Sequence, residues 1–270
     1  MANETSTATV SSTPTYAPGT PMWVDLATPD VEAATRFYNQ IFGWTSQDLG
    51  EEAGHYTMFF KNGKMVAAAS PPQNPNQPPA WSTYIATDNA EETASKVKEA
   101  GGQVLMAPFQ VMDQGTMGVF MDPGGAVFCV WQPAAHKGAE LVNEPGGFSW
   151  NELATRDMDA ARAFYTRVFP WTAKVNDMPQ GGQYVEWQVN GRSIAGGQTM
   201  GPMYPPNVPP HWLVYFTVEN TDETVKRAQE LGGKVTAPAM DIPQGRFAVL
   251  TDPQGAAFAV IQFPQSSSRG

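Results

Sequence analysis

The chain contains the same long pattern twice, at an offset of roughly 130 residues. The repeated pieces are WVDLATPD at 23–30 and WNELATRD at 150–157, KEAGG at 98–102 and QELGG at 229–233, and DPGGA at 122–126 and DPQGA at 252–256. A repeat of this length is a whole domain and not one module of a solenoid. The sequence therefore predicts two domains of the same fold, in which each copy can be compared with the other.

Composition excludes several classes of function. The chain has 270 residues, a net charge of −10 and no cluster of Lys and Arg. Binding to nucleic acid or to an anionic membrane needs such a cluster, so we expect neither partner. Cys129 is the single cysteine, which excludes an internal disulfide and favours a reducing compartment. No signal peptide and no bilayer-spanning apolar run is recognisable, so we expect a cytoplasmic protein.

Within each repeat, a smaller pattern of strand, helix and three strands occurs twice. In the first such unit, apolar residues alternate over 22–27, which is typical of a strand covered on one face. Asp30 is a suitable N-cap for a helix over 31–41, whose apolar residues recur at helical spacing. Further strands follow, joined by a hairpin turn at Asn62-Gly63. The sequence therefore predicts an α+β fold made of four βαβββ units.

The domain boundaries follow from these units and from the turn-forming residues between them. We expect a disordered tail at 1–18, a first domain at 19–134, a linker at 135–146, a second domain at 147–264 and a tail at 265–270. Because the linker is short and contains Gly and Pro, we expect the domains to pack against each other as a pseudo-symmetric pair.

Three motifs carry a resemblance to a known family. They are the D-x-x-x-A-x-x-F-Y helix start at Asp30, the Gly-Gly pair after the second helix of each repeat, and the DPxGAxF segments that open the closing strands. With the four βαβββ units, they make the chain resemble the vicinal oxygen chelate superfamily. That superfamily includes glyoxalase I, extradiol dioxygenases, fosfomycin-resistance enzymes and bleomycin-binding proteins. The resemblance implies two tandem domains of the glyoxalase/bleomycin-resistance type with curved mixed sheets, similar to two-domain bacterial glyoxalase-like or hydroxylase proteins.

In the metal-dependent members, His, Gln or Glu ligands lie on the concave faces of the sheets. The resemblance matches these positions to Trp23, Ala68, Ser82 and Cys129 in the first domain, and to Trp150, Gly196, Leu213 and Ala259 in the second. A catalytic metal needs about three N, O or S ligands, and Cys129 alone among these residues qualifies. The histidines, His55, His136 and His211, lie in different units and share no metal-binding spacing. We therefore expect no metal and no cofactor.

We call the concave face of the first domain cup 1 and that of the second domain cup 2. Side chains alternate along a strand, so a series anchored on Trp23 predicts which residues point into each cup. The candidate ligand-binding residues are Trp23, Tyr84, Cys129 and Trp131 in cup 1, and Trp150, His211, Leu213 and Tyr215 in cup 2. Asp25 and Glu152 are the candidate catalytic residues, because a dry carboxyl has a raised pKa and can act as a general base.

Each candidate also has a purely structural interpretation. Trp23 and Trp150 could fill the cups as core residues. Asp25 and Glu152 could only accept hydrogen bonds from neighbouring groups. Cys129 is most simply an inert core thiol, and His211 a histidine at a strand edge. The Pro-rich loops are stiff connectors in this interpretation; in the functional one, Met200, Met203 and Tyr204 form an apolar lid over cup 2.

Two classes of function fit these residues. The favoured one is a metal-independent protein that binds a small apolar or aromatic organic molecule in a cup, as sequestering proteins do. The alternative is a metal-free enzyme that uses Asp25 or Glu152, with tyrosines, for proton transfer on a carbonyl, epoxide or polyketide-like substrate. A metal-dependent lyase or dioxygenase ranks third, because the ligands are missing. The expected partner is a small organic molecule, and a homodimer stays open.

Overall fold

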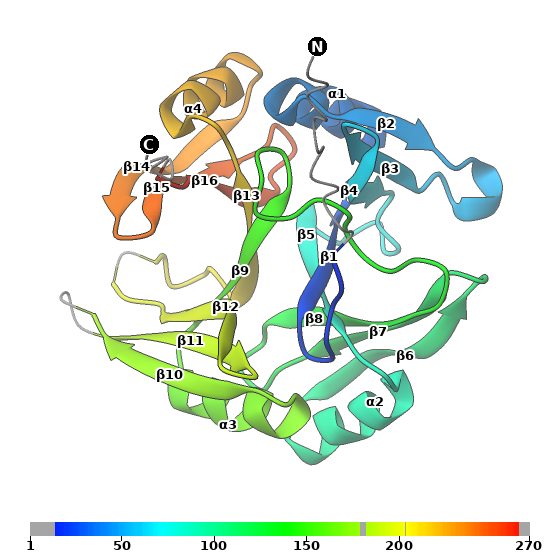
Figure 1. The fold of residues 1–270 in the computed structure, drawn as a ribbon, viewed down its shortest axis with the longest axis vertical. Helices are drawn as coiled ribbons and strands as arrows, with labels where there is room; N and C mark the ends of the chain where they lie inside the picture. Colours follow the sequence, from blue (N-terminus) through cyan, green and yellow to red (C-terminus); the bar gives the residue numbers. More distant parts are fainter. Residues whose placement is uncertain (1–13, 179–181, 203, 265–270) are drawn as a thin grey trace, which may run out of the picture.

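The pattern of strand, helix and three strands occurs four times in the computed structural model, which describes residues 14–178, 182–202 and 204–264. The first repeat contains β1 (Pro21–Ala27), α1 (Val31–Phe42), β2 (Thr45–Asp48), the 3-10 turn η1 (Glu51–Ala53), β3 (Thr57–Lys61), β4 (Lys64–Ser70), β5 (Ala80–Ala86), α2 (Ala90–Glu99), β6 (Gln103–Val111), β7 (Gly115–Met121) and β8 (Val127–Pro133). The second repeat contains β9 (Phe148–Thr155), α3 (Met158–Val168), β10 (Thr172–Asp177), β11 (Gln183–Val189), β12 (Arg192–Thr199), β13 (His211–Thr217), α4 (Thr221–Glu230), β14 (Lys234–Ile242), β15 (Gly245–Thr251) and β16 (Ala257–Gln262). The predicted α+β fold of four βαβββ units is confirmed (Figure 1).

Each repeat forms one mixed, curved sheet of eight strands. The strand order is β2-β3-β4-β1-β5-β8-β7-β6 in the first repeat and β10-β11-β12-β9-β13-β16-β15-β14 in the second. The two units of a repeat meet at the antiparallel pair in the middle, where Trp23 lies opposite Tyr84 and Asp25 opposite Ser82. The parallel partners β4 and β8 flank this pair, so the cup residues predicted from the sequence lie on adjacent central strands.

The helices begin where the sequence provides a capping side chain. The Asp30 carboxylate accepts a hydrogen bond from the Ala33 backbone N–H at 2.9 Å, as predicted. Asp157 caps α3 in the same way, which shows how closely the two repeats agree. Helix α1 ends at Gly43, whose φ of 64° is the left-handed conformation that glycine adopts most readily.

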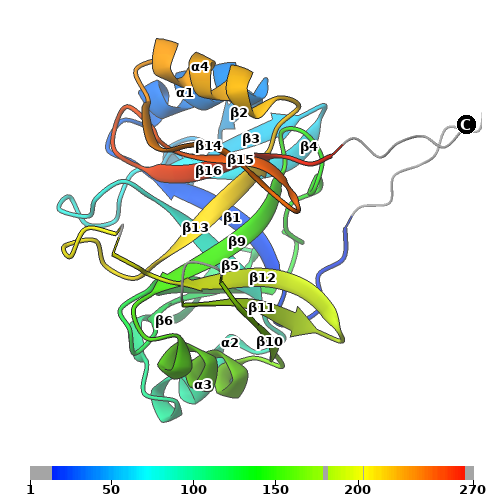
Figure 2. The ribbon, with the colours of Figure 1, turned by 90° about the vertical axis from the view of Figure 1, so that its left-hand side faces the viewer.

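The two repeats complete each other's cores. Helix α1 lies beside α4 at one end of the molecule, and α2 lies beside α3 at the other (Figure 2). The apolar side of α1 packs on the second repeat, with Phe37 and Tyr38 against Phe258. The Tyr38 hydroxyl donates to Asp252 at 3.0 Å, and Tyr165 donates to Asp122 at the same distance in the pseudo-symmetric position. The hydrophobic cores therefore belong to pairs of units from different repeats.

The backs of the two sheets face each other, so the cups open away from the molecular centre. Thr83 on β5 donates a buried hydrogen bond of 2.8 Å to Asn151 on β9, which joins the two backs. Because side chains alternate along a strand, the neighbours of Thr83 and Asn151 point into the cups instead. None of the helices in the described part of the chain is long and apolar enough to cross a membrane.

Candidate functional site

Cup 1 contains a chain of hydrogen bonds centred on the carboxyl of Asp25. Tyr84 donates to Asp25 Oδ2 at 2.8 Å and Tyr56 donates to the same oxygen at 3.1 Å. The indole N–H of Trp23 donates to the Tyr56 hydroxyl at 3.0 Å. Burial raises the pKa of Asp25 from 3.8 to about 6, although the bonds from Tyr84, Tyr56 and Ser82 act against this shift. The carboxyl is therefore shielded from water and holds its proton to a higher pH than an exposed aspartate does.

Cup 2 repeats this arrangement with different residues. Tyr215 donates to Glu152 Oε1 at 3.0 Å, and Trp150 donates to the Tyr184 hydroxyl at 3.0 Å. Burial raises the pKa of Glu152, against hydrogen bonds from Tyr215 and Tyr184. Gln198 adds a contact that cup 1 lacks, because its amide donates to Glu152 Oε1 at 3.0 Å. Each cup thus holds a Trp, two Tyr and one buried carboxyl in the same order.

Sequence reasoning missed Tyr56, Tyr184 and Gln198. Tyr56 lies just before β3, and Tyr184 lies near the start of β11, the corresponding strand of the second repeat. The tyrosines occupy matching places in the two copies of the repeat, and this internal conservation was a signal that could have identified them. Gln198 pairs with Ala154 in the sheet, where Ser70 pairs with Ala27 in cup 1, so it belongs to cup 2 alone.

The positions that correspond to metal ligands lie together on the cup faces. Ala68 and Ser82 flank Asp25, and Cys129 lies beside Tyr84. Gly196 and Leu213 flank Glu152, and Ala259 lies beside Tyr215.

Their chemistry does not fit a divalent metal. A Cβ atom built on Gly196 would lie 2.2 Å from the Tyr184 hydroxyl and 2.6 Å from Trp150 Nε1, so the Trp–Tyr pair covers this position closely. Within the described residues, no group of three or more His, Cys, Asp or Glu is placed to hold a metal ion. The cups therefore offer aromatic, hydroxyl and carboxyl groups, and not a metal-binding set.

Cup 1 is closed by its own side chains. Trp23, Tyr84, Cys129 and Trp131 are each less than 10% exposed, and all four belong to the main hydrophobic core. Burial raises the pKa of the Cys129 thiol, as expected for an inert core thiol. The interpretation in which Trp23 fills the cup as a core residue describes cup 1.

Cup 2 is more open. Its apolar residues Leu213, Tyr215, Ala259 and Ile261 form a cluster separate from the two main cores. Half-buried side chains pack at the margin of this cluster, among them Trp150 and Phe247. Glu152 lies at the base of the cup with 6% of its surface exposed. Aromatic surface around one buried carboxyl is the composition of a small-molecule site.

The loop between β12 and β13 reaches into cup 2. Gln198 donates to the Tyr204 hydroxyl at 2.7 Å, which links the loop to Glu152. Arg156 fixes the loop, because its guanidinium donates to the carbonyl oxygens of Pro205 and Val208, each at 3.0 Å.

The other residues predicted to lie in or near this loop are His211, Met200 and Met203. The ring of His211 lies 6.5 Å from that of Tyr204, and its Nδ1 is 2.9 Å from the Pro209 carbonyl oxygen. Met200 is buried, and Met203 lies outside the described residues. Tyr204 is therefore the loop residue that contacts the polar centre of cup 2.

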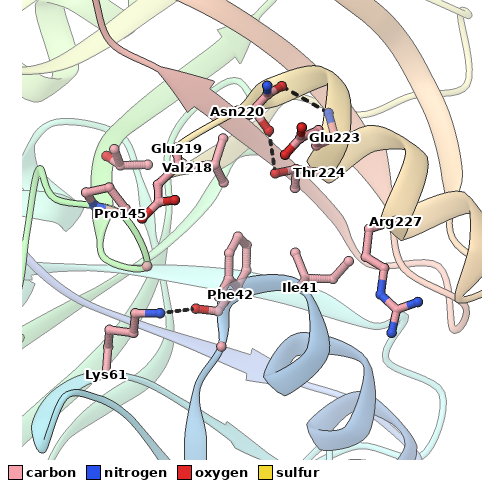
Figure 3. Close-up of a pocket in the computed structure, with 13 residues that line it drawn as sticks. Ile41, Phe42, Lys61, Pro145, Val218, Glu219, Asn220, Glu223, Thr224 and Arg227 are labelled. Carbon is pink, nitrogen blue, oxygen red and sulfur yellow. Dashed lines mark hydrogen bonds between the residues drawn. The ribbon is translucent and has the colours of Figure 1, made fainter. Parts of the chain in front are cut away.

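A pocket of about 330 Å³ lies between the repeats, outside both cups (Figure 3). It is formed by the end of α1 and the start of α4, with Lys61 on one side, where Nζ donates to the Phe42 carbonyl oxygen at 2.8 Å. Glu219, Glu223 and Arg227 line it as well, so its charges are mixed. None of the cup residues lines this pocket. Its mixed charges do not favour one class of ligand.

Two segments of the chain, residues 21–130 and 147–260, match the family described as the Glyoxalase/Bleomycin resistance protein/Dioxygenase superfamily. The provisionally named glyoxylase CFP32 of Mycobacterium tuberculosis is 45% identical over 253 residues, covering 92% of this chain and 96% of CFP32. The anthracycline biosynthesis protein DnrV of Streptomyces peucetius is 40% identical over 262 residues, covering 92% of this chain and 94% of DnrV. The Mn(II)-bound glyoxalase of Novosphingobium aromaticivorans has the same fold, with a TM-score of 0.63, 18% identity, and coverage of 91% of this chain and 82% of that one.

Proposed function

The chain belongs to the glyoxalase/bleomycin resistance protein/dioxygenase superfamily, and we propose that it binds a small aromatic or apolar organic molecule in cup 2 without a bound metal. The observation that carries this proposal is the contrast between the cups. The apolar residues of cup 1 are part of the main core, whereas those of cup 2 form a separate cluster with half-buried Trp150 and Phe247 at its margin. A ligand can contact these rings without dismantling the core.

The chemistry of cup 2 suggests the kind of ligand. Trp150, Phe247 and Tyr215 offer ring surfaces for a flat molecule, and Glu152 offers one hydrogen-bonding end. Tyr215 and Gln198 both bond to Glu152 Oε1, so neither uses Oε2. Two relatives are named for anthracycline biosynthesis, and anthracyclines are planar hydroxylated quinones. We therefore propose a flat ring system with hydroxyl or carbonyl groups as the ligand. We also propose that the protein is located in the cytoplasm.

Fluorescence titration with alizarin, a hydroxylated anthraquinone, tests this function. We expect alizarin to quench tryptophan emission and Trp150→Leu to weaken its binding at least about tenfold, through lost stacking and apolar contact. Asp25→Asn is the matched control in cup 1 and should leave the affinity unchanged. Equal weakening by Trp150→Leu and by a cup 1 substitution, or no saturable binding, would contradict the assignment to cup 2.

The catalytic alternative is favoured by one specific observation, the raised pKa of Glu152 in a dry cup. If Glu152 is a general base, Glu152→Gln should abolish turnover and spare affinity, because a base acts in the transition state. If the protein only binds, Glu152→Gln should change affinity by a few-fold and alizarin should be recovered unchanged, by mass spectrometry. A product that depends on Glu152 would replace the binding function with the enzymatic one.

We expect the purified protein to contain no stoichiometric transition metal. The eight positions that match metal ligands carry Trp, Ala, Ser, Gly, Leu and Cys side chains, which lack the convergent donors that a divalent ion needs. Elemental analysis of protein prepared without chelator checks this. A content of about one Zn, Ni, Fe or Mn per chain, with ligand binding lost on chelation, is the contrary result.

A further inference from the structure

One ring nitrogen in the linker has no hydrogen-bond partner. Nε2 of His136 is buried, and no donor or acceptor lies within reach of it. The imidazole stands edge-on to two rings of cup 1, with its centroid 4.4 Å from that of Trp23 and 5.7 Å from that of Trp131. An unpaired buried nitrogen costs free energy, so the ring is held there by its other contacts.

The backbone around His136 fixes the position of the ring. The His136 N–H donates to the Gln114 carbonyl oxygen at 3.1 Å, and its carbonyl oxygen accepts the indole N–H of Trp131 at 3.0 Å. Further along the linker, Ala139 donates to the Met22 carbonyl oxygen at 2.9 Å. The linker is therefore built along the edge of cup 1, and the imidazole is inserted into the cup.

The inserted ring is neutral. Burial lowers the pKa of His136 to about 4, and Glu140, the charged group that acts on it, raises the pKa by a smaller amount. At neutral pH the side chain is thus an uncharged, flat nitrogen heterocycle between tryptophans. Such a ring has the character of the aromatic ligands that tryptophan-lined sites accept.

Cup 2 has no counterpart of this ring among the described residues. Strand β16 ends at Gln262, and Ile261 occupies the position that Trp131 has in cup 1. The described residues that follow, Phe263 and Pro264, are exposed. The two cups therefore share their Trp–Tyr–carboxyl chain and differ in the inserted imidazole.

We propose that His136 is an internal ligand of cup 1, and that cup 1 without this side chain is a binding site for imidazole or a similar flat nitrogen heterocycle. The imidazole ring occupies the place of a ligand and limits the chain to one open cup. This inference rests on the proposed function only in taking cup 2 as the cup that stays open.

Titration of His136→Ala with imidazole tests the proposal. Removing the ring leaves an imidazole-sized space beside Trp23 and Trp131, and a ligand of five heavy atoms can bind there with a Kd on the order of millimolar. We expect one imidazole per chain by calorimetry, with a change in tryptophan fluorescence. The wild-type protein and His136→Phe, whose ring fills the same space, should show no such binding.

Thermal unfolding tests the proposal even if the substitution destabilises the variant. If His136→Ala is only partly folded, imidazole should raise its melting temperature and leave that of the wild type unchanged. A variant that neither binds imidazole nor is stabilised by it overturns the internal-ligand proposal, as does equal binding by the wild type. Alizarin binding in cup 2 is measured separately with the wild-type chain, so either proposal can fail without the other.

Discussion

Asp25→Asn should make the protein more stable at pH 8, by about 2–3 kcal/mol of unfolding free energy. Burial raises the pKa of this carboxyl from 3.8 to about 6, and one pKa unit corresponds to about 1.4 kcal/mol. Because the folded state holds the proton more tightly than the unfolded state, the wild-type protein loses stability as pH rises from about 4 to 6. The amide cannot ionise, so it avoids this loss and can still accept hydrogen bonds from the tyrosines.

Denaturant unfolding at several pH values between 4 and 8 measures the effect. The difference between Asp25→Asn and wild type should be largest above pH 6 and shrink towards pH 4, as the pH approaches 3.8, the pKa of the carboxyl in the unfolded chain. Asp177→Asn, at an exposed position, is the matched control and should change little. Lower stability of Asp25→Asn at pH 8 would mean that the carboxylate charge itself holds cup 1 together.

Phe216→Ala should lower the free energy of unfolding by about 3–5 kcal/mol, the usual cost of a truncated core phenylalanine. Phe216 is fully buried on β13, where it contacts Phe42 and Trp44 of the first repeat as well as Phe258 of its own. The substitution therefore removes packing between the repeats. Phe109→Ala, at a ring that is 39% exposed, is the control and should cost much less.

The shared core also predicts how the protein unfolds. Both repeats should unfold in one transition, seen at the same denaturant concentration by circular dichroism and by tryptophan fluorescence. Residues 14–134 and 147–264 expressed separately should not fold stably, because each would expose the surface that α1 or α3 covers in the other repeat. Two separate transitions, or two stable fragments, would show that the repeats fold independently.

The fold could be predicted from local patterns because its units are local. Alternation along β1, the cap at Asp30 and the Gly-Gly helix ends each depend on a few neighbouring residues. Because the domain is duplicated, the pattern of each element occurs in two copies. The helix over 31–41 was correctly predicted from its apolar spacing. Phe258, the partner of its Phe37 and Tyr38, lies more than 200 residues away, and no local pattern encodes such a contact.

The candidate site was predicted only in part for the same reason. The alternation anchored on Trp23 correctly identified that Asp25 and Tyr84 point into one cup, since both lie on regular strands. Tyr56 lies outside a strand, so the alternation of side chains along strands could not predict its position. His136 was assigned to the linker without a role, because its contact with Trp23 depends on the path of the linker through space. The roles of these residues in binding or catalysis stay predictions.

A crystal structure of the protein soaked with alizarin would show where the ligand binds. We predict that alizarin lies in cup 2 against Trp150 and Phe247, with an oxygen within hydrogen-bonding distance of the Glu152 carboxyl and no metal ion beside it. Alizarin bound elsewhere, such as in the pocket between α1 and α4, or held through a metal ion in either cup, would contradict metal-free binding in cup 2.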